Sequence, residues 1–256
     1  MIKAVRQKKI SELLSRASVL SVRDLSSEFA VAESTIRRDL EELERRGELR
    51  RTYGGAVMID ATEAETPFVQ RSVTNLEKKR AIGQVACSLV QDGDTIFIDG
   101  GTTTEQMVPC LAKKQRLTVI TCGLNIANSL TQCPEVDTIL TGGFVDLESM
   151  TVIPIFDDEK SPHERINISK VFFSCAGVSA DTGITNRIVA RISTKKKLLE
   201  TATDLILLVD GSKVGSDAAI VLAPVTTITH MITDDSAPEE EIAKIRAKGV
   251  KVTVVA

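Results

Sequence analysis

A loop rich in glycine and threonine, Asp99-Gly100-Gly101-Thr102-Thr103-Thr104, is the stretch of this sequence best suited to bind a ligand. It follows an apolar run, Thr95–Ile98, that predicts a buried strand, and it precedes a predicted helix from Glu105 to Lys113. In such a loop the backbone amides and the helix N-terminus point at a bound anion, and hydroxyl groups donate to it. The loop therefore predicts a phosphate site, with an ordinary strand–helix turn as the alternative. It is not a Walker A sequence, because no Gly-Lys-Ser/Thr follows.

Other small and acidic residues also follow predicted strands. Gly142 and Gly143 come soon after the apolar run that ends at Leu140, and Asp210 follows the run that ends at Val209. Beyond residue 76 strands and helices alternate, which predicts an α/β domain with a mostly parallel sheet and helices on both faces. Ligands bind such sheets at the carboxyl ends of the strands, where these residues are expected to lie.

A second set of chemically suited residues lies near the N-terminus, on a predicted amphipathic helix from Ser34 to Arg46. Its apolar residues fall at i, i+4 and i+7, which is one face of a helix, and are Ile36, Leu40 and Leu43. Thr35, Arg37 and Arg38 point elsewhere, and Gly47 ends the helix. Arginine and threonine in the first turns of a helix can contact guanine edges and phosphates in the DNA major groove. The alternative is an ordinary solvated helix.

The neighbouring segments favour the DNA-binding interpretation. The sequence predicts a helix over 4–16, a second helix from Ser21 to Phe29, a turn over 30–32 and then the amphipathic helix. Two helices and a turn followed by a third helix with exposed threonine and arginine predict a helix-turn-helix. Arg50 and Arg51 then begin a short ribbon that Gly54-Gly55 is expected to turn, a wing suited to phosphate contact.

Composition describes a globular chain of one large domain or two. The 256 residues are 43% hydrophobic and 26% charged, with a net charge of -3. Residues 1–55 hold 12 Lys/Arg and 9 Asp/Glu, a net of +3, and the remainder carries -6. No apolar run approaches the ~20 residues of a membrane helix, and no signal peptide is recognisable. The polar connector suggests domains over 1–57 and 76–256 with a linker over 58–75.

The cysteines and histidines predict no metal site and no cofactor. Five cysteines, an odd number without a CxxC pair, suggest free thiols in a reducing compartment. His163 and His230 are far apart in the sequence, which disfavours a His/Cys metal site.

The N-terminal segment resembles the DeoR family of transcriptional regulators. The resemblance rests on Thr35-Ile36-Arg37-Arg38-Asp39-Leu40, followed by Leu43, Gly47, Leu49, Arg51 and Gly54-Gly55-Ala56. It implies a winged helix-turn-helix whose DNA-contacting residues would be Ser34, Thr35, Arg37, Arg38, Arg50, Arg51 and Tyr53. Two positions depart from the family pattern, since Ala32 replaces a serine and Tyr53 replaces a histidine.

The resemblance extends through the second domain to about residue 235. It implies a fold similar to ribose-5-phosphate isomerase and a phosphorylated sugar or related metabolite as effector. The effector would contact Asp99, Gly100, Gly101, Thr102, Thr103, Thr104, Gly142, Gly143, Lys195, Asp210 and Lys213, with the two lysines as charge partners of the phosphate. Cys122 stands where the family has asparagine, and Ile153 precedes Pro154 where the family often has glycine, which suggests a different ligand or an altered pocket.

These observations predict a DNA-binding regulator, most simply a cytoplasmic repressor of a carbohydrate-metabolism operon. Its partners would be operator DNA, a phosphorylated effector and further copies of itself in a dimer or tetramer, without a membrane partner. Two alternatives remain open at this point. One is a sugar-phosphate isomerase with Asp99 or Asp210 as base. The other is a regulator with a degenerate effector pocket.

Overall fold

The structure is a computed structural model that describes residues 2–17, 19–45, 49–52, 55–58, 67–153, 166–187 and 192–256. The chain divides into two compact units, Met1–Ala64 and Glu65–Ala256. Residues 67–75, which the sequence assigns to a connector, belong to the second unit and contain the helix α4 (Phe68–Val73). A six-residue helix is too short to show a clear apolar period, so the sequence did not reveal it.

The first unit is a helix-turn-helix with a small antiparallel sheet. It contains α1 (Lys3–Ala17), β1 (Val19–Ser21), α2 (Val22–Phe29), α3 (Glu33–Arg45), β2 (Leu49–Thr52) and β3 (Gly55–Met58), and the sheet order is β1-β3-β2. The Ser21 hydroxyl caps α2 by accepting a hydrogen bond from Asp24 N at 3.0 Å. The helices and the wing bury one core, which consists of Ile10, Val22, Leu25, Ile36, Leu40, Leu43, Leu49 and Ala56.

Strand β1 is an element that the sequence analysis missed. Its three residues are too few for an alternating pattern, and it pairs with β3 through Leu20 and Ala56. At Gly55 a Cβ atom would lie 2.0 Å from the Leu20 carbonyl oxygen, so this strand pair requires glycine there. Gly47, Tyr53 and Gly54 lie outside the described residues.

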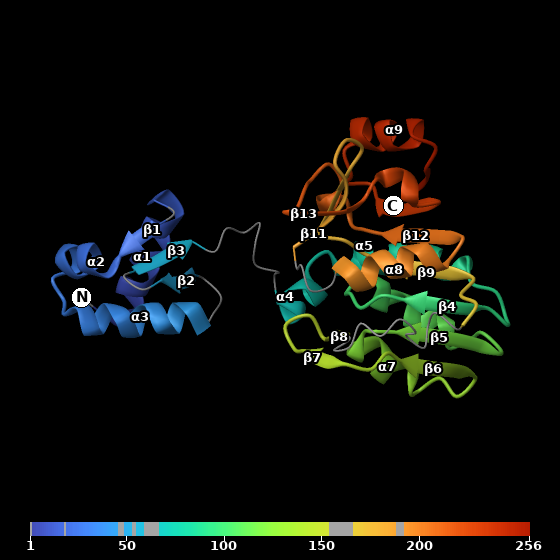
Figure 1. The fold of residues 1–256 in the computed structure, drawn as a ribbon, viewed down its shortest axis with the longest axis horizontal. Coiled ribbons are helices and arrows are strands. Elements are labelled where there is room, and N and C mark those ends of the chain that lie inside the picture. The colour runs from blue at the N-terminus through green and yellow to red at the C-terminus, as the bar shows by residue number, and fades with distance from the viewer. Residues whose placement is uncertain are drawn as a thin grey trace. The chain divides into compact units, whose positions relative to one another are not determined.

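The second unit is built on a seven-stranded parallel sheet. Its strands are β4 (Thr95–Ile98), β5 (Leu117–Thr121), β6 (Val136–Leu140), β9 (Lys170–Phe173), β12 (Asp204–Leu208), β14 (His230–Asp234) and β15 (Lys251–Val255), in the order β15-β14-β12-β9-β4-β5-β6. Two antiparallel additions accompany it: the three-stranded sheet β10 (Gly177–Ser179), β11 (Gly183–Asn186) and β13 (Ile220–Ala223), and the hairpin β7 (Phe144–Asp146) and β8 (Thr151–Ile153). Figure 1 shows the small sheet toward one end of the unit and the hairpin toward the other.

Both faces of the large sheet are covered, because alternate side chains of its strands enter two separate cores. One core includes Phe97, Phe173 and Leu207 with residues of α8 (Ile192–Thr201), α9 (Glu239–Ala247) and the small sheet. The other includes Ile96, Phe172 and Leu208 with residues of α5 (Leu76–Ser88), α6 (Val108–Leu111) and α7 (Leu124–Leu130). Burial on both faces explains why the strands read as continuous apolar runs. The predicted fold class, a helix-turn-helix domain joined to a parallel α/β domain, is confirmed.

Two local predictions need correction. The helix expected over Glu105–Lys113 is instead a 3₁₀ turn, η1 (Thr104–Met107), followed by the short α6, in which Pro109 occupies the first turn. A proline is tolerated there but not in a helix interior, which explains the break. Cys87 of α5 and Cys110 of α6 form a disulfide, so the expectation of free thiols is wrong for these two, and Cys122, Cys133 and Cys175 are free. No helix in the described part of the chain could span a membrane.

Candidate functional site

A cavity of about 370 Å³ opens at the carboxyl ends of β4, β9 and β12. This is within the range of small-molecule sites. Seven residues predicted from the sequence line it, namely Gly100, Gly101, Thr102, Thr103, Lys195, Asp210 and Lys213. Eleven lining residues were not predicted, and these are Arg71, Thr74, Asn75, Lys79, Ser174, Cys175, Ala176, Asn186, Arg187, Ser212 and Ser216.

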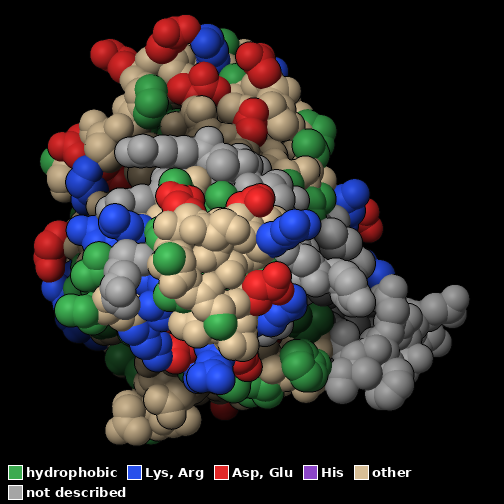
Figure 2. Space-filling view, turned by 90° about the vertical axis from the view of Figure 1, so that its left-hand side faces the viewer, with side chains coloured by type: hydrophobic (Ala, Val, Ile, Leu, Met, Phe, Trp, Pro, Cys, Tyr) green, Lys and Arg blue, Asp and Glu red, His purple; other side chains and the backbone are tan. Residues whose placement is uncertain are grey.

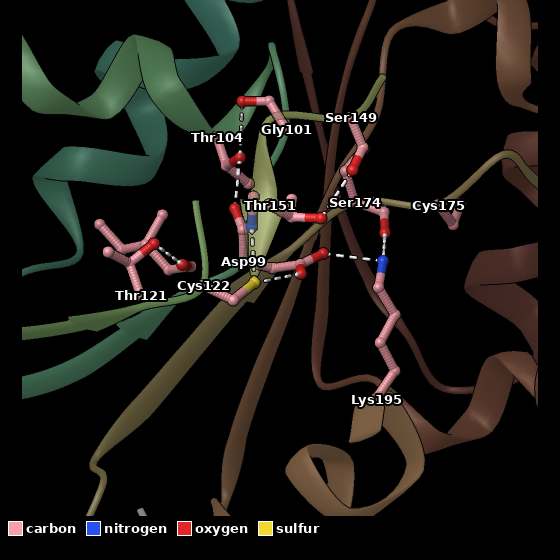
Figure 3. Close-up of polar contacts among 12 residues, drawn as sticks. Asp99, Gly101, Thr104, Thr121, Cys122, Ser149, Thr151, Ser174, Cys175 and Lys195 are labelled. Atoms are coloured by element: carbon pink, nitrogen blue, oxygen red, sulfur yellow. Dashed lines mark hydrogen bonds and ion pairs between the residues drawn. The ribbon is translucent and has the colours of Figure 1, made fainter. Parts of the chain in front are cut away.

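The Gly/Thr loop is held in shape by its last threonine. The Thr104 hydroxyl donates to the Asp99 carbonyl oxygen at 2.7 Å and lies 3.1 Å from that of Gly101 (Figure 3). Thr104 is fully buried and does not line the cavity. It was predicted to contact the effector, but in the structure its hydroxyl group holds the loop instead. At Gly100 a Cβ atom would lie 2.2 Å from the Thr151 methyl carbon, which explains the glycine. The loop therefore presents its backbone and Thr102 and Thr103 to the cavity.

Asp99 supports the site from behind the loop. Its carboxylate pairs with Lys195 Nζ at 2.8 Å and accepts a hydrogen bond from Cys122 Sγ at 3.4 Å (Figure 3). Burial and the Asp99 charge raise the pKa of the Cys122 thiol to about 12, so the thiol stays protonated and can donate. Asp99 does not line the cavity, and neither does Cys122 or Ile153. Cys122 thus orients Asp99 from outside the pocket.

Asp210 and Lys213 lie on the opposite side of the cavity, at the end of β12. The Asp210 carboxylate accepts hydrogen bonds from Asn75 Nδ2 at 3.1 Å and from the Ser212 hydroxyl. Lys213 Nζ donates to the Cys175 carbonyl oxygen at 2.9 Å, which leaves further donors of the ammonium for a ligand. Burial is the main cause that lowers the pKa of Lys213 below its usual value.

Lys79 is the most informative residue that the sequence analysis missed. Only 3% exposed, it donates to the Arg71 carbonyl oxygen at 2.6 Å and to Thr102 Oγ1 at 3.1 Å. Burial, with the charges of Lys213 and Arg71, lowers its pKa to about 8. In the sequence it stands in a charged run at the start of α5. It shares a helix face with Ile82 and Ala86, however, and a lysine on a buried stripe is a signal that could have identified it.

Two buried side-chain atoms of the cavity wall lack a hydrogen-bond partner among the described residues. These are Ser174 Oγ and Asn186 Nδ2. Buried polar groups are nearly always paired, so each calls for an explanation, and a polar ligand in the cavity supplies one.

Gly142 and Gly143 do not belong to the site. They follow β6, which is an edge strand separated from β9 by β4 and β5, and neither lines the cavity. The sequence shows where strands end but not their order in the sheet, which is why the prediction placed them there.

The N-terminal unit displays its own candidate surface on α3. Ile36, Leu40 and Leu43 are buried, whereas Arg37 and Arg38 are exposed. Arg37 makes a surface ion pair with Glu33 at 3.0 Å. Of the other predicted contacts, Ser34 is exposed and Thr35 half-buried on α3, and Arg50 and Arg51 lie on β2. Figure 2 shows acidic and basic side chains interspersed on the face that it draws.

Comparisons with known proteins agree for both units. Residues 6–62 match the DeoR-like helix-turn-helix domain, and residues 74–235 match the DeoR C terminal sensor domain. The transcriptional regulator YulB of Bacillus subtilis (strain 168) is 34% identical over 255 residues, covering 100% of this chain and 98% of that protein. The transcriptional repressor AccR of Agrobacterium fabrum (strain C58) is 31% identical over 231 residues, covering 90% of this chain and 88% of that protein.

Among solved structures, the ribose 5-phosphate isomerase A of Methanocaldococcus jannaschii overlaps 55% of each chain, with a TM-score of 0.40 and 17% identity. Both relatives are named as transcriptional regulators, and the two domain matches cover most of this chain. The chain belongs to the DeoR family of helix-turn-helix transcriptional regulators.

Proposed function

We propose that this regulator represses a carbohydrate-metabolism operon and that a phosphorylated sugar or related metabolite, bound in the cavity of the second unit, controls its binding to operator DNA. The name of the Agrobacterium relative supports a repressor. Both operator DNA and phosphorylated sugars occur in the cytoplasm, where the protein would act.

The observation that carries the effector class is the set of groups around the cavity. Cationic side chains from five places in the sequence, Arg71, Lys79, Arg187, Lys195 and Lys213, line it together with the Gly/Thr loop. Lysine and arginine with backbone amides and hydroxyls are the groups that bind phosphate. The acidic Asp210, with Asn75 and Ser212, offers hydrogen-bonding groups for sugar hydroxyls.

The isomerase alternative fits this geometry poorly. A general base must reach the proton that it abstracts. The Asp99 carboxylate is instead held by Lys195 and Cys122 and lies outside the lining, and the relatives of this chain are named as transcriptional regulators. We therefore propose that the site binds its ligand without transforming it.

A thermal-shift screen of phosphorylated sugars, each paired with its unphosphorylated parent, tests this function. Ligand at 100 times its dissociation constant stabilises the unit that binds it by about 2.7 kcal/mol. For 150–250 residues that raises the midpoint by roughly 5–10 °C. We expect one phosphosugar to give this shift while its parent does not. A flat result would favour a degenerate pocket instead.

Lys213→Ala should abolish most of this response. Removing one charged hydrogen bond to phosphate costs about 1.5–3 kcal/mol, which weakens binding roughly 10- to 150-fold. Because burial already disfavours the Lys213 charge, the variant should fold and bind operator DNA normally. Lys196→Ala, an exposed lysine of α8, is the matched control and should respond like the wild type. If the ligand raised the thermal midpoint of both variants equally, Lys213 would not contact the ligand.

Affinity for the phosphate should fall as the pH rises through about 8. Lys79 is charged below its pKa of about 8, and a phosphate dianion stabilises the charged form. Above that pH, Lys79 must take up a proton from solution when phosphate binds, which weakens the observed affinity. We expect about tenfold weaker binding at pH 9 than at pH 7 in calorimetric titrations with inorganic phosphate, because the charged fraction of Lys79 falls by about that factor. Lys79→Met should bind more weakly and with a shallower pH dependence. Equal affinity of the wild type at pH 7 and pH 9 would contradict this role.

A further inference from the structure

Most exposed apolar side chains of the second unit lie on a few neighbouring elements. In the described part of this unit, nine large apolar side chains are exposed, and seven of them lie on α4, on β6 or on the β7–β8 hairpin. We call these seven the α4–hairpin surface: Val69, Val73, Ile139, Leu140, Phe144, Val145 and Leu147. The other two, Val221 and Val254, lie on β13 and β15.

The elements of the α4–hairpin surface are joined to one another. The first amide of α4, at Phe68, donates to the Glu148 carbonyl oxygen in the hairpin turn at 3.0 Å. Only residues 141–143 separate the end of β6 from the start of β7. Figure 1 shows α4 beside the hairpin. Phe144 and Leu147 are 64% and 74% exposed, and large exposed apolar side chains gathered on adjoining elements are typical of an interaction site.

Strand β6 adds an edge of the large sheet to this surface. Among the strands that the structure describes it pairs only with β5, and of its five residues only Val136 is buried. An edge strand with apolar residues presents backbone groups that another chain can pair with, and proteins ordinarily cover or charge such edges.

We propose that a second copy of this chain covers the α4–hairpin surface. A helix-turn-helix head reads one half-site, and paired heads read two half-sites about 34–36 Å apart. The segment 59–66 joins the head to the second unit and enters α4 at Pro67. Eight residues span at most about 28 Å. If α4 lies at the interface, the two copies of segment 59–66 start from neighbouring points of the dimer. The two helix-turn-helix units can then reach both half-sites.

The same helix also reaches the effector cavity. Val69 and Val73 are one turn apart, whereas Arg71 projects about 200° around the helix from Val69, and Arg71 and Thr74 line the cavity. No residue of α4 is buried, and Lys79 holds it through the Arg71 carbonyl oxygen. A ligand that engages Arg71 or Lys79 therefore acts on an element of the pairing surface.

Sedimentation velocity of the full chain without DNA tests the pairing. The wild type should sediment as a dimer, or as a tetramer with this surface as one of its contacts. Phe144→Asp and Leu147→Asp place a charge in the apolar surface and should raise the dissociation constant of the pair at least 30-fold. Both side chains are exposed, so the variants should keep their circular dichroism and their thermal midpoint at low concentration.

Val221→Asp and Val254→Asp are the matched controls, because they place the same charge on exposed valines elsewhere in the unit. They should assemble like the wild type. A monomeric wild type at 100 µM, assembled Phe144→Asp and Leu147→Asp variants, or dissociation of the two controls as well would overturn the proposal. The measurement uses neither operator nor effector, so it can fail independently of the proposed function.

Discussion

Asp39→Ala should strongly destabilise the N-terminal unit while the second unit keeps its stability. Asp39 is 2% exposed, and its carboxylate pairs with Arg6 Nε, whose side chain is 7% exposed, and accepts from Gln7 Nε2 at 3.4 Å. Removing one partner of a buried ion pair costs about 3–5 kcal/mol, because the other charge stays desolvated. A domain of this size is stable by only about 3–10 kcal/mol. Operator binding should be lost as a result.

Differential scanning calorimetry of the full chain would show this as loss of one transition, or a downward shift of at least 12 °C, with the other unchanged. Glu33→Ala is the matched control, because it breaks the exposed Glu33–Arg37 pair of the same helix and should cost at most about 0.5 kcal/mol. Replacing both buried partners, as Arg6→Met with Asp39→Leu, should restore stability. A small shift for Asp39→Ala, similar to that of Glu33→Ala, would show that the buried pair contributes little.

Local periodicity was enough to predict the helix-turn-helix. Ile36, Leu40 and Leu43 repeat at helical spacing and are all buried, and the alternation of strands and helices gave the parallel α/β unit. The Gly/Thr loop was also visible, because its chemistry is contained in six consecutive residues. What lies in one element or one turn can be read from the sequence.

The rest of the cavity depends on how distant elements meet. Arg187 follows β11 of the small sheet, and Arg71 and Asn75 lie where the sequence suggested only a connector. Gly142 and Gly143 show the opposite error, since they end a strand of the right sheet but one at its edge. Strand order and the packing of short elements depend on tertiary structure, and no local pattern in the sequence predicts them.

Cys122 shows how a change of residue type can be misjudged from sequence. Replacement of an amide by a thiol suggested an altered pocket, but the side chain lies behind the Gly/Thr loop. There it donates to Asp99 and accepts from Gly100 N at 3.3 Å. A protonated thiol can fulfil both roles, so the loop and its anion-binding groups keep their geometry.

Arg37→Ala and Arg38→Ala should each weaken operator binding about 5- to 150-fold, which corresponds to about 1–3 kcal/mol per lost contact. Both side chains are exposed beside the buried stripe of α3, so neither change should alter stability by more than about 0.5 kcal/mol. If a side chain contacts a phosphate, the slope of log affinity against log salt should fall by about 1. If it contacts a base, discrimination between operator and random DNA should fall instead.

Arg45→Ala is the matched control. Recognition helices contact bases through their N-terminal residues, and Arg45 is exposed at the C-terminal end of the same helix. Fluorescence anisotropy at several salt concentrations measures affinity and slope together. Arg45→Ala should bind like the wild type, and a double Arg37→Ala, Arg38→Ala variant should retain only weak binding with a shallow salt dependence. Should the double variant bind operator as tightly as Arg45→Ala does, α3 would not be the element that reads DNA, and the wing strands β2 and β3 would be tested in its place.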